Sequence, residues 1–227
     1  MGLPLYLAMT AAEFTACSSL PARPAWMACH FSPYGTGLSN IPKKLPRGAM
    51  LILNDRTPIH GHDPKAIVQQ LQGLEFSSLL LDFQRKDSSQ TMAVTKAILE
   101  GLDCLVGVSE LYGKDLDCPV FLPPVPPGTS VEDHLAPWRD REVWLEAALD
   151  SLRYTVTAEG SAAAPPDRLP ETGLRDESLH CHYHIEVHKD SVDFTLFRTR
   201  EDLAALLEAA GSIGVTRAVG LYQELGG

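Results

Sequence analysis

The sequence predicts an α/β fold: a small (β/α)8 TIM-like barrel with some helices missing and a small antiparallel β insertion after strand seven. Three observations predict it. Eight short apolar segments recur along the 227 residues, and most of them end in polar side chains. Segments with apolar residues at helical spacing separate several of them, which favours parallel strands joined by right-handed crossovers. Between the seventh and eighth segments the pattern changes to strict alternation, which is typical of half-exposed antiparallel strands.

The eight expected barrel strands are continuous apolar runs, as in strands that are buried on both faces. They are Leu3–Thr10, Ala25–Phe31, Ala49–Leu53, Ser77–Asp82, Cys104–Val108, Cys118–Leu122, Glu142–Leu145 and Ala218–Tyr222. The connections 31–49 and 112–118 lack the residues for a full crossover helix. An open sheet is therefore the alternative to a closed barrel. Strand faces without a helix would need cover from another chain, so we expect a homodimer.

Helix starts are marked at three places in the chain. Asp63 is a good N-cap and Pro64 suits the first helical position. Ser88 and Ser89 can begin the following helix. Thr199, with Asp202 three residues later, has the pattern of a capping box and predicts the helix before the last strand.

Residues 150–197 are expected to form the β insertion within a single barrel domain, 1–227. Residues 152–157 alternate, and a flexible Ala/Pro/Gly-rich link is expected over Ser161–Gly173. The segment 181–196 predicts a hairpin that turns at Lys189-Asp190.

Composition limits the function classes. The net charge is −10 and no block of Lys and Arg occurs, which argues against nucleic acid or an anionic membrane as a partner. No run reaches the ~18 apolar residues of a membrane helix. The five cysteines form no CxxC pair, which indicates reduced thiols in a cytoplasmic protein. We expect a small-molecule ligand and no cofactor, because no P-loop, GxGxxG or GxSxG motif is present.

The fourth expected strand ends in Leu80–Gln84 (LLDFQ), and the last is Ala218–Tyr222 (AVGLY). Together with the strand order and the late insertion, these segments resemble the family 18 glycoside hydrolases, the chitinase-like barrels. Asp82 falls on the last Asp of the family's DxxDxDxE strand end, and Tyr222 lies near the family's usual Trp. The resemblance implies an oligosaccharide ligand at the C-terminal ends of the strands.

One residue departs from the family pattern. Gln84 stands where the family has the glutamate that protonates the glycosidic oxygen. An amide cannot supply that proton at neutral pH. Ser77 and Leu80 also replace Asp residues of the motif. The resemblance therefore implies a carbohydrate-binding, catalytically degenerate relative.

Other strand-end carboxylates leave an enzyme of a different mechanism open. Glu110 and Glu146 are the leading acid/base pair, and Asp82 is the third candidate catalytic residue. The same pattern is also explained by acidic residues that are simply exposed to water at the open end of the barrel and have no catalytic role. The candidate ligand-binding residues also follow strands, and they are His30, Asp55, Gln84, Tyr112, Tyr222 and Glu224.

Two pairs of histidines are candidate metal ligands. His60 and His62 follow the third strand near Asp55, in a segment that a Gly-containing loop explains as well. His182 and His184 occupy alternate positions of one strand, ~7 Å apart, where a solvated hairpin face explains them equally. We predict no bound metal.

Overall fold

The computed structural model describes residues 2–86 and 89–226. Eight parallel strands form a closed barrel, which confirms the predicted fold and excludes the open sheet. β1 also pairs with β2, with Ala8 opposite Ala25, and this pairing closes the ring. The barrel strands, in spatial order, are β1 (Leu5–Met9), β14 (Val215–Leu221), β8 (Val143–Ala147), β7 (Val120–Leu122), β6 (Leu105–Ser109), β5 (Ser78–Asp82), β4 (Met50–Asn54) and β2 (Pro24–Phe31).

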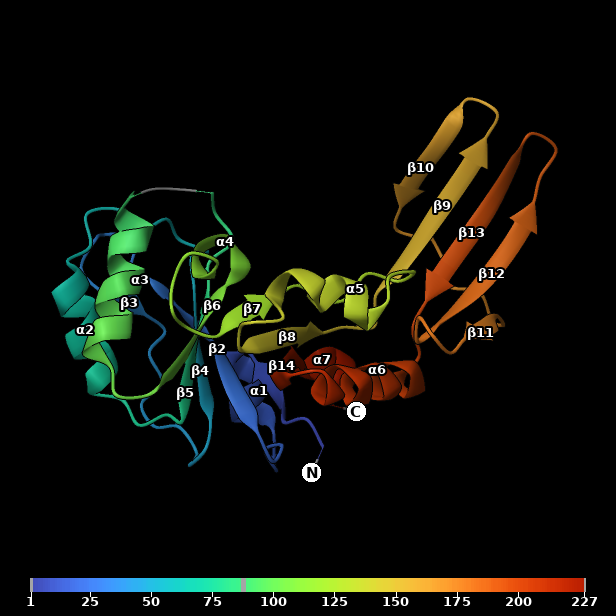
Figure 1. Cartoon of the computed structure of the whole chain (residues 1–227). Helices are drawn as coiled ribbons and strands as arrows, with labels where there is room; N and C mark the ends of the chain where they lie inside the picture. Colours follow the sequence, from blue (N-terminus) through green and yellow to red (C-terminus); the bar gives the residue numbers. More distant parts are fainter. Residues whose placement is uncertain (1, 87–88, 227) are drawn as a thin grey trace.

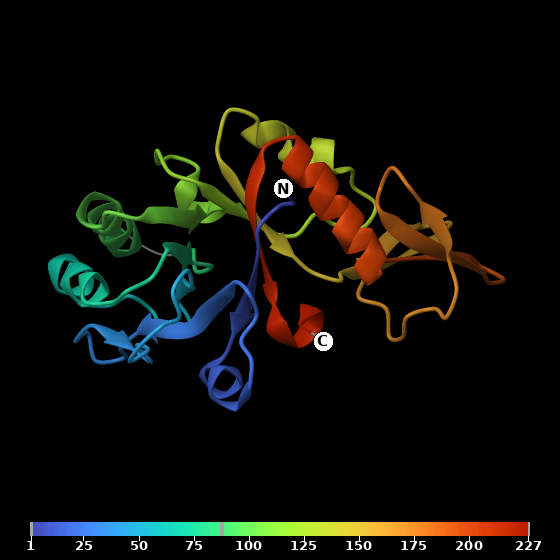
Figure 2. The same ribbon diagram turned by 90° about the horizontal axis from the view of Figure 1, so that it is seen from below.

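The outer helical layer is uneven (Figure 2). Between β2 and β4 the chain forms β3 (Leu38–Ser39), antiparallel to β2, in place of a helix. A 3₁₀ turn (Ala136–Trp138) lies just before β8. The α-helices are α1 (Ala11–Ala16), α2 (Pro64–Gln72), α3 (Ser89–Gly101), α4 (Glu110–Gly113), α5 (Val131–Leu135), α6 (Arg200–Ser212) and α7 (Tyr222–Leu225).

Each predicted helix start that lies within the described residues agrees with the structure. Asp63 caps α2 by accepting from the Lys65 N–H, and Pro64 is the first helical residue. Thr199 and Asp202 form the expected capping box of α6. Ser88, expected at the start of α3, lies outside the described residues.

Side chains fill the barrel interior, as expected for eight strands. The largest of them is Trp144 on β8, which is fully buried. Gly107 on the nearby β6 leaves room for its ring, and the Arg217 guanidinium lies 4.8 Å from the ring centre. The other buried residues of this inner cluster are Tyr6, Ala8, Ala25, Met50, Ile52, Leu80, Phe121 and Val219.

The insertion is a five-stranded antiparallel sheet that projects away from the barrel (Figure 1). Its spatial order is β10 (Gly160–Ala164), β9 (Ser151–Thr157), β13 (Ser191–Phe197), β12 (Cys181–Val187) and β11 (Leu174–Asp176). The expected flexible link over Ser161–Gly173 is wrong for its first residues, which pair with β9 as β10. The sequence did not predict this strand because it contains three consecutive alanines, and alanine has a low strand propensity.

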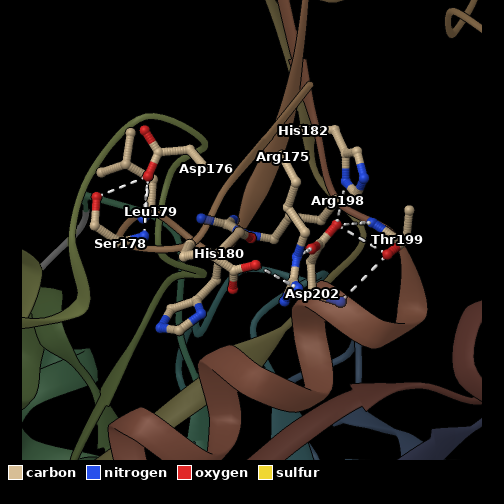
Figure 3. A network of polar contacts seen from close by, with 10 residues as sticks. Arg175, Asp176, Ser178, Leu179, His180, His182, Arg198, Thr199 and Asp202 are labelled. Carbon is tan, nitrogen blue, oxygen red and sulfur yellow. Dashed lines mark hydrogen bonds and ion pairs between the residues drawn. The ribbon is translucent and has the colours of Figure 1, made fainter. Parts of the chain in front are cut away.

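A polar network joins this sheet to the barrel (Figure 3). The carboxylate of Asp202 on α6 is fully buried and accepts hydrogen bonds from Arg175 Nε (2.9 Å) and His182 Nδ1 (2.7 Å). Nearby, the buried Arg198 donates to the carbonyls of His180 and Val125. The base of the insertion is therefore held to the barrel by buried charge-assisted hydrogen bonds.

No helix among the described residues is long and apolar enough to span a bilayer.

Candidate functional site

A cavity of about 530 Å³ opens at the C-terminal ends of the barrel strands. Strand period explains which residues reach it, since alternate residues point to the same face. Asp82 lies two positions after the inward Leu80, and Glu146 two after Trp144. The described residues that line the cavity are Ala8, Met27, Ile52, Asn54, Leu80, Asp82, Gln84, Lys86, Ser109, Glu110, Leu111, Phe121, Pro123, Glu146, Val219, Gly220 and Leu221.

Gln84 and Asp82 are in direct contact in this cavity. The Gln84 side-chain amide donates to Asp82 Oδ1 at 2.6 Å. The position that the family resemblance assigns to a proton donor therefore holds a neutral donor that stabilises a carboxylate.

The backbone that carries Gln84 is firmly held. Both Asp55 carboxylate oxygens accept backbone N–H groups, from Gln84 at 3.1 Å and Arg85 at 2.8 Å. The Tyr112 hydroxyl donates to the Arg85 carbonyl at 2.6 Å. The Ser109 hydroxyl donates to the Phe83 carbonyl at 2.7 Å. Asp55 and Tyr112 are thus supports of the site, and neither lines the cavity.

Two cavity carboxyls have perturbed acidity. Burial raises the pKa of Asp82, the hydrogen bond from Gln84 opposes that rise, and the charge of Asp55 adds to it. Burial likewise raises the pKa of Glu146, to about 7, with further contributions from the negative charges of Asp82, Asp150 and Glu224. A carboxyl with a pKa near 7 can donate or accept a proton at neutral pH.

The structure brings four of the predicted site residues together: Asp82, Gln84, Glu110 and Glu146 all line the cavity. Glu110 comes from the first turn of α4, just after β6. The proposed acid/base pair therefore shares one cavity, while its catalytic role stays a prediction.

Three other predicted ligand-binding residues lie outside the cavity lining. His30 contacts the Phe31 carbonyl through Nδ1 at 2.9 Å and the Asn40 amide through Nε2 at 3.1 Å. The Tyr222 hydroxyl lies 3.5 Å from Cys17 Sγ. Glu224 accepts the Leu149 N–H at 2.5 Å, and its negative charge contributes to the raised pKa of Glu146.

The candidate metal residues serve local structure. The His62 ring is buried, packs edge-on against Phe31 and accepts the His60 N–H at 3.1 Å. His182 Nδ1 is hydrogen-bonded to the Asp202 carboxylate. His184 lies 3.5 Å from Glu186. Among the described residues, neither predicted histidine pair belongs to a group of three close ligand side chains.

Sequence reasoning missed the polar cavity residues Asn54, Lys86 and Ser109, and apolar lining residues such as Met27. Asp55 is predicted from the sequence as a ligand-binding residue, whereas the adjacent Asn54 lines the cavity. The alternation of side chains along a strand (its parity) distinguishes the two residues. Asn54 lies two positions after Ile52, whose side chain points into the barrel, so Asn54 shares that face. Asp55 has the opposite parity.

Comparison with protein-family models and with curated proteins finds no match to this chain. Solved structures do match. The spore cortex-lytic enzyme SleL of Bacillus cereus is 8% identical with a TM-score of 0.53, and the match covers 96% of this chain and 70% of that one. The C-terminal domain of a candidate chitinase from Desulfitobacterium hafniense is 10% identical with a TM-score of 0.53, covering 98% and 94%.

A candidate sporulation-specific glycosylase from Bacillus subtilis, YdhD, is 10% identical with a TM-score of 0.50, and the match covers 86% of this chain and 90% of that one. At such identities the likeness shows the fold alone. The chain therefore shares the barrel fold of these structures.

Proposed function

We propose that this protein binds an N-acetylated oligosaccharide in the barrel-mouth cavity and does not hydrolyse it by the family 18 mechanism. The observation that carries the proposal is the hydrogen bond from the Gln84 amide to Asp82 in that cavity. The fold neighbours described as chitinase and glycosylase support the ligand class.

The cavity suits a sugar in size and chemistry. Its volume of about 530 Å³ lies in the ~300–1,000 Å³ range of small-molecule sites. Asn54 and Gln84 provide amide groups with hydrogen-bonding capacity left for hydroxyl and acetamido partners, beside apolar side chains such as Met27 and Leu111. The Ser109 hydroxyl is engaged with Phe83. Phe121 is the one aromatic side chain among the described lining residues, so we expect polar contacts to dominate over stacking.

The absence of family-type hydrolysis follows from the chemistry of Gln84. Protonation of the glycosidic oxygen needs a group that can release a proton near neutral pH, and a carboxamide does not. The Gln84 NH₂ group is also directed at Asp82. Sugar binding needs only hydrogen bonds and apolar contact, which an amide supplies.

Calorimetric titration with chitin oligosaccharides tests the binding proposal. The wild-type protein should bind, and Asp82→Ala should lower the affinity at least tenfold. Glu100→Gln, an exposed change on the outer helix α3, is the matched control and should bind like wild type. A folded wild-type protein that binds none of these oligosaccharides would refute the proposal.

A second function, hydrolysis by a different mechanism, is favoured by one observation. Glu146 lines the same cavity and has a pKa of about 7, as a general acid requires. If the protein is such a hydrolase, a screen of aryl glycosides should show turnover that Glu146→Gln abolishes and Glu100→Gln leaves intact. Turnover that survives Glu146→Gln would exclude Glu146 as its acid.

A further inference from the structure

Three ligand-type side chains meet at the end of the insertion that is far from the barrel. Glu186 on β12 lies directly opposite Asp193 on β13. His188 follows the end of β12, and its N–H donates to the Ser191 carbonyl at 2.9 Å, which closes the turn. Figure 1 shows this end of the β12–β13 hairpin extending away from the barrel. One ligand atom from each of Glu186, His188 and Asp193 lies within 4.8 Å of the other two.

The separations match the edges of a metal coordination shell. His188 Nε2 lies 3.5 Å from Asp193 Oδ2, and His184 Nε2 lies 3.5 Å from Glu186 Oε1. Two ligands at about 2.0–2.2 Å from one tetrahedral ion are roughly 3.4 Å apart. His184 lies on the same face of the sheet beside Glu186, but it is outside the group whose ligand atoms lie within 4.8 Å of one another.

Asp193 adds an independent observation. Its side chain is 16% exposed, and its Oδ1 atom is buried without a hydrogen-bond partner among the described residues. A buried carboxylate oxygen without a partner is costly. A cation bound to this carboxylate would remove that cost.

The surrounding charges leave room for a cation. Arg153 lies on the neighbouring strand β9, opposite Thr195, and its guanidinium is directed to Asp167 at 3.1 Å. Lys189 occupies the exposed turn next to His188. Glu186 and Asp193 thus contribute two negative charges beside the imidazole of His188.

We propose that Glu186, His188 and Asp193 bind a divalent transition-metal ion of the zinc class, with water as the fourth ligand. Mixed imidazole and carboxylate ligands suit Zn²⁺, whereas Ca²⁺ and Mg²⁺ require six or more oxygen ligands. The ion ties β12 to β13 at the turn. This site is separate from the barrel-mouth cavity, so the zinc proposal does not depend on the proposed oligosaccharide binding.

Calorimetric titration of the whole protein with zinc chloride tests the proposal. Wild type should bind one ion with micromolar or tighter affinity. His188→Ala and Asp193→Asn should each weaken binding at least tenfold, while Lys189→Ala in the same turn should bind like wild type. His60→Ala tests the other histidine loop and should also leave binding unchanged.

Two further measurements locate the ion. Circular dichroism checks that each variant is folded, and hydrogen exchange should show slower exchange of the His188 amide when zinc is added. Absence of binding heat in wild type would overturn the proposal. Equal zinc affinity in wild type and the His188→Ala/Asp193→Asn double variant would also overturn it, because the ion would then lie elsewhere, for example on a cysteine thiol.

Discussion

The side-chain amide of Gln84 donates a 2.6 Å hydrogen bond to the Asp82 carboxylate two residues earlier. Residues two apart in extended chain share a face, so both side chains reach the same cavity. The contact favours the ionised form of Asp82 against the effect of its burial. A glutamate at this position would instead compete with Asp82 for a proton.

Gln84→Leu should raise the pKa of Asp82 further. The change removes the hydrogen bond that lowers this pKa and leaves the burial and the Asp55 charge that raise it. Carboxyl NMR titration of the variant measures the shift. Gln69→Leu on the exposed face of α2 is the control and should leave the Asp82 titration unchanged. An Asp82 pKa that stays constant or falls in Gln84→Leu would show that the contact is not made in solution.

The raised pKa of Glu146 should make the protein less stable as the pH rises from about 4.5 to 7. In that window the folded protein holds a proton at Glu146 that the unfolded chain has released, so the free energy of unfolding falls with increasing pH. Allowing for the partial exposure of Glu146, the loss is about 2 kcal/mol. Urea unfolding of wild type and Glu146→Gln at pH 4.5, 6 and 8 measures it.

Glu146→Gln should remove that part of the pH dependence and be the more stable protein at pH 8. Glu100→Gln should keep the wild-type slope, because Glu100 is exposed on α3. If the free energy of unfolding changes with pH in the same way in wild type and Glu146→Gln, the raised pKa of Glu146 is contradicted.

Gly107→Ala should destabilise the barrel by about 1–3 kcal/mol, as overpacking of a filled core does. A Cβ at this position would clash with the six-membered ring of Trp144, which is fully buried and packed under Arg217. Gly73→Ala at the end of α2 is the control, since its φ is −75° and its new Cβ meets only ordinary contacts. Equal unfolding midpoints for the two variants would mean that the barrel interior is more loosely packed than the structure shows.

Asp202→Asn should loosen the attachment of the insertion. Burial alone raises the pKa of Asp202, but hydrogen bonds from Thr199, His182 and Arg175 outweigh it and lower the pKa. Removing the charge weakens the hydrogen bonds from His182 and Arg175, although Arg175 keeps its contact with Glu177 at 2.8 Å. We therefore expect a loss of roughly 1–3 kcal/mol in unfolding free energy.

Faster hydrogen exchange in β11 and β12 should accompany that loss. The neighbouring Glu201→Gln, at an exposed position of the same helical turn, should change neither quantity by more than about 0.5 kcal/mol. Unchanged exchange in β12 of Asp202→Asn would show that Asp202 does not hold the insertion.

The barrel could be predicted because its signals are local. Each parallel strand is a continuous apolar run. The caps Asp63 and Thr199 mark helix starts through hydrogen bonds with residues two or three positions later. The open-sheet alternative could not be excluded from the sequence, because closure requires β1 to pair with β14, more than 200 residues away, as well as with β2.

The site was predicted in part for a related physical reason. Strands buried on both faces do not alternate, so the sequence does not say which strand-end residue points inward. Asp82 and Glu146 happened to have the inward parity, whereas Asp55 did not and Asn54 did. The Glu186–Asp193 pair requires the hairpin register, which the structure supplies.

The most direct test of the central claim measures binding and turnover on the same sample. Wild-type protein is titrated with a chitin oligosaccharide by calorimetry, and the mixture is then analysed by mass spectrometry for shorter products. We predict saturable binding, at least tenfold weaker in Asp82→Ala, with no shorter oligosaccharide formed by wild type. Cleavage by wild type, or an affinity that Asp82→Ala leaves unchanged, would contradict the account.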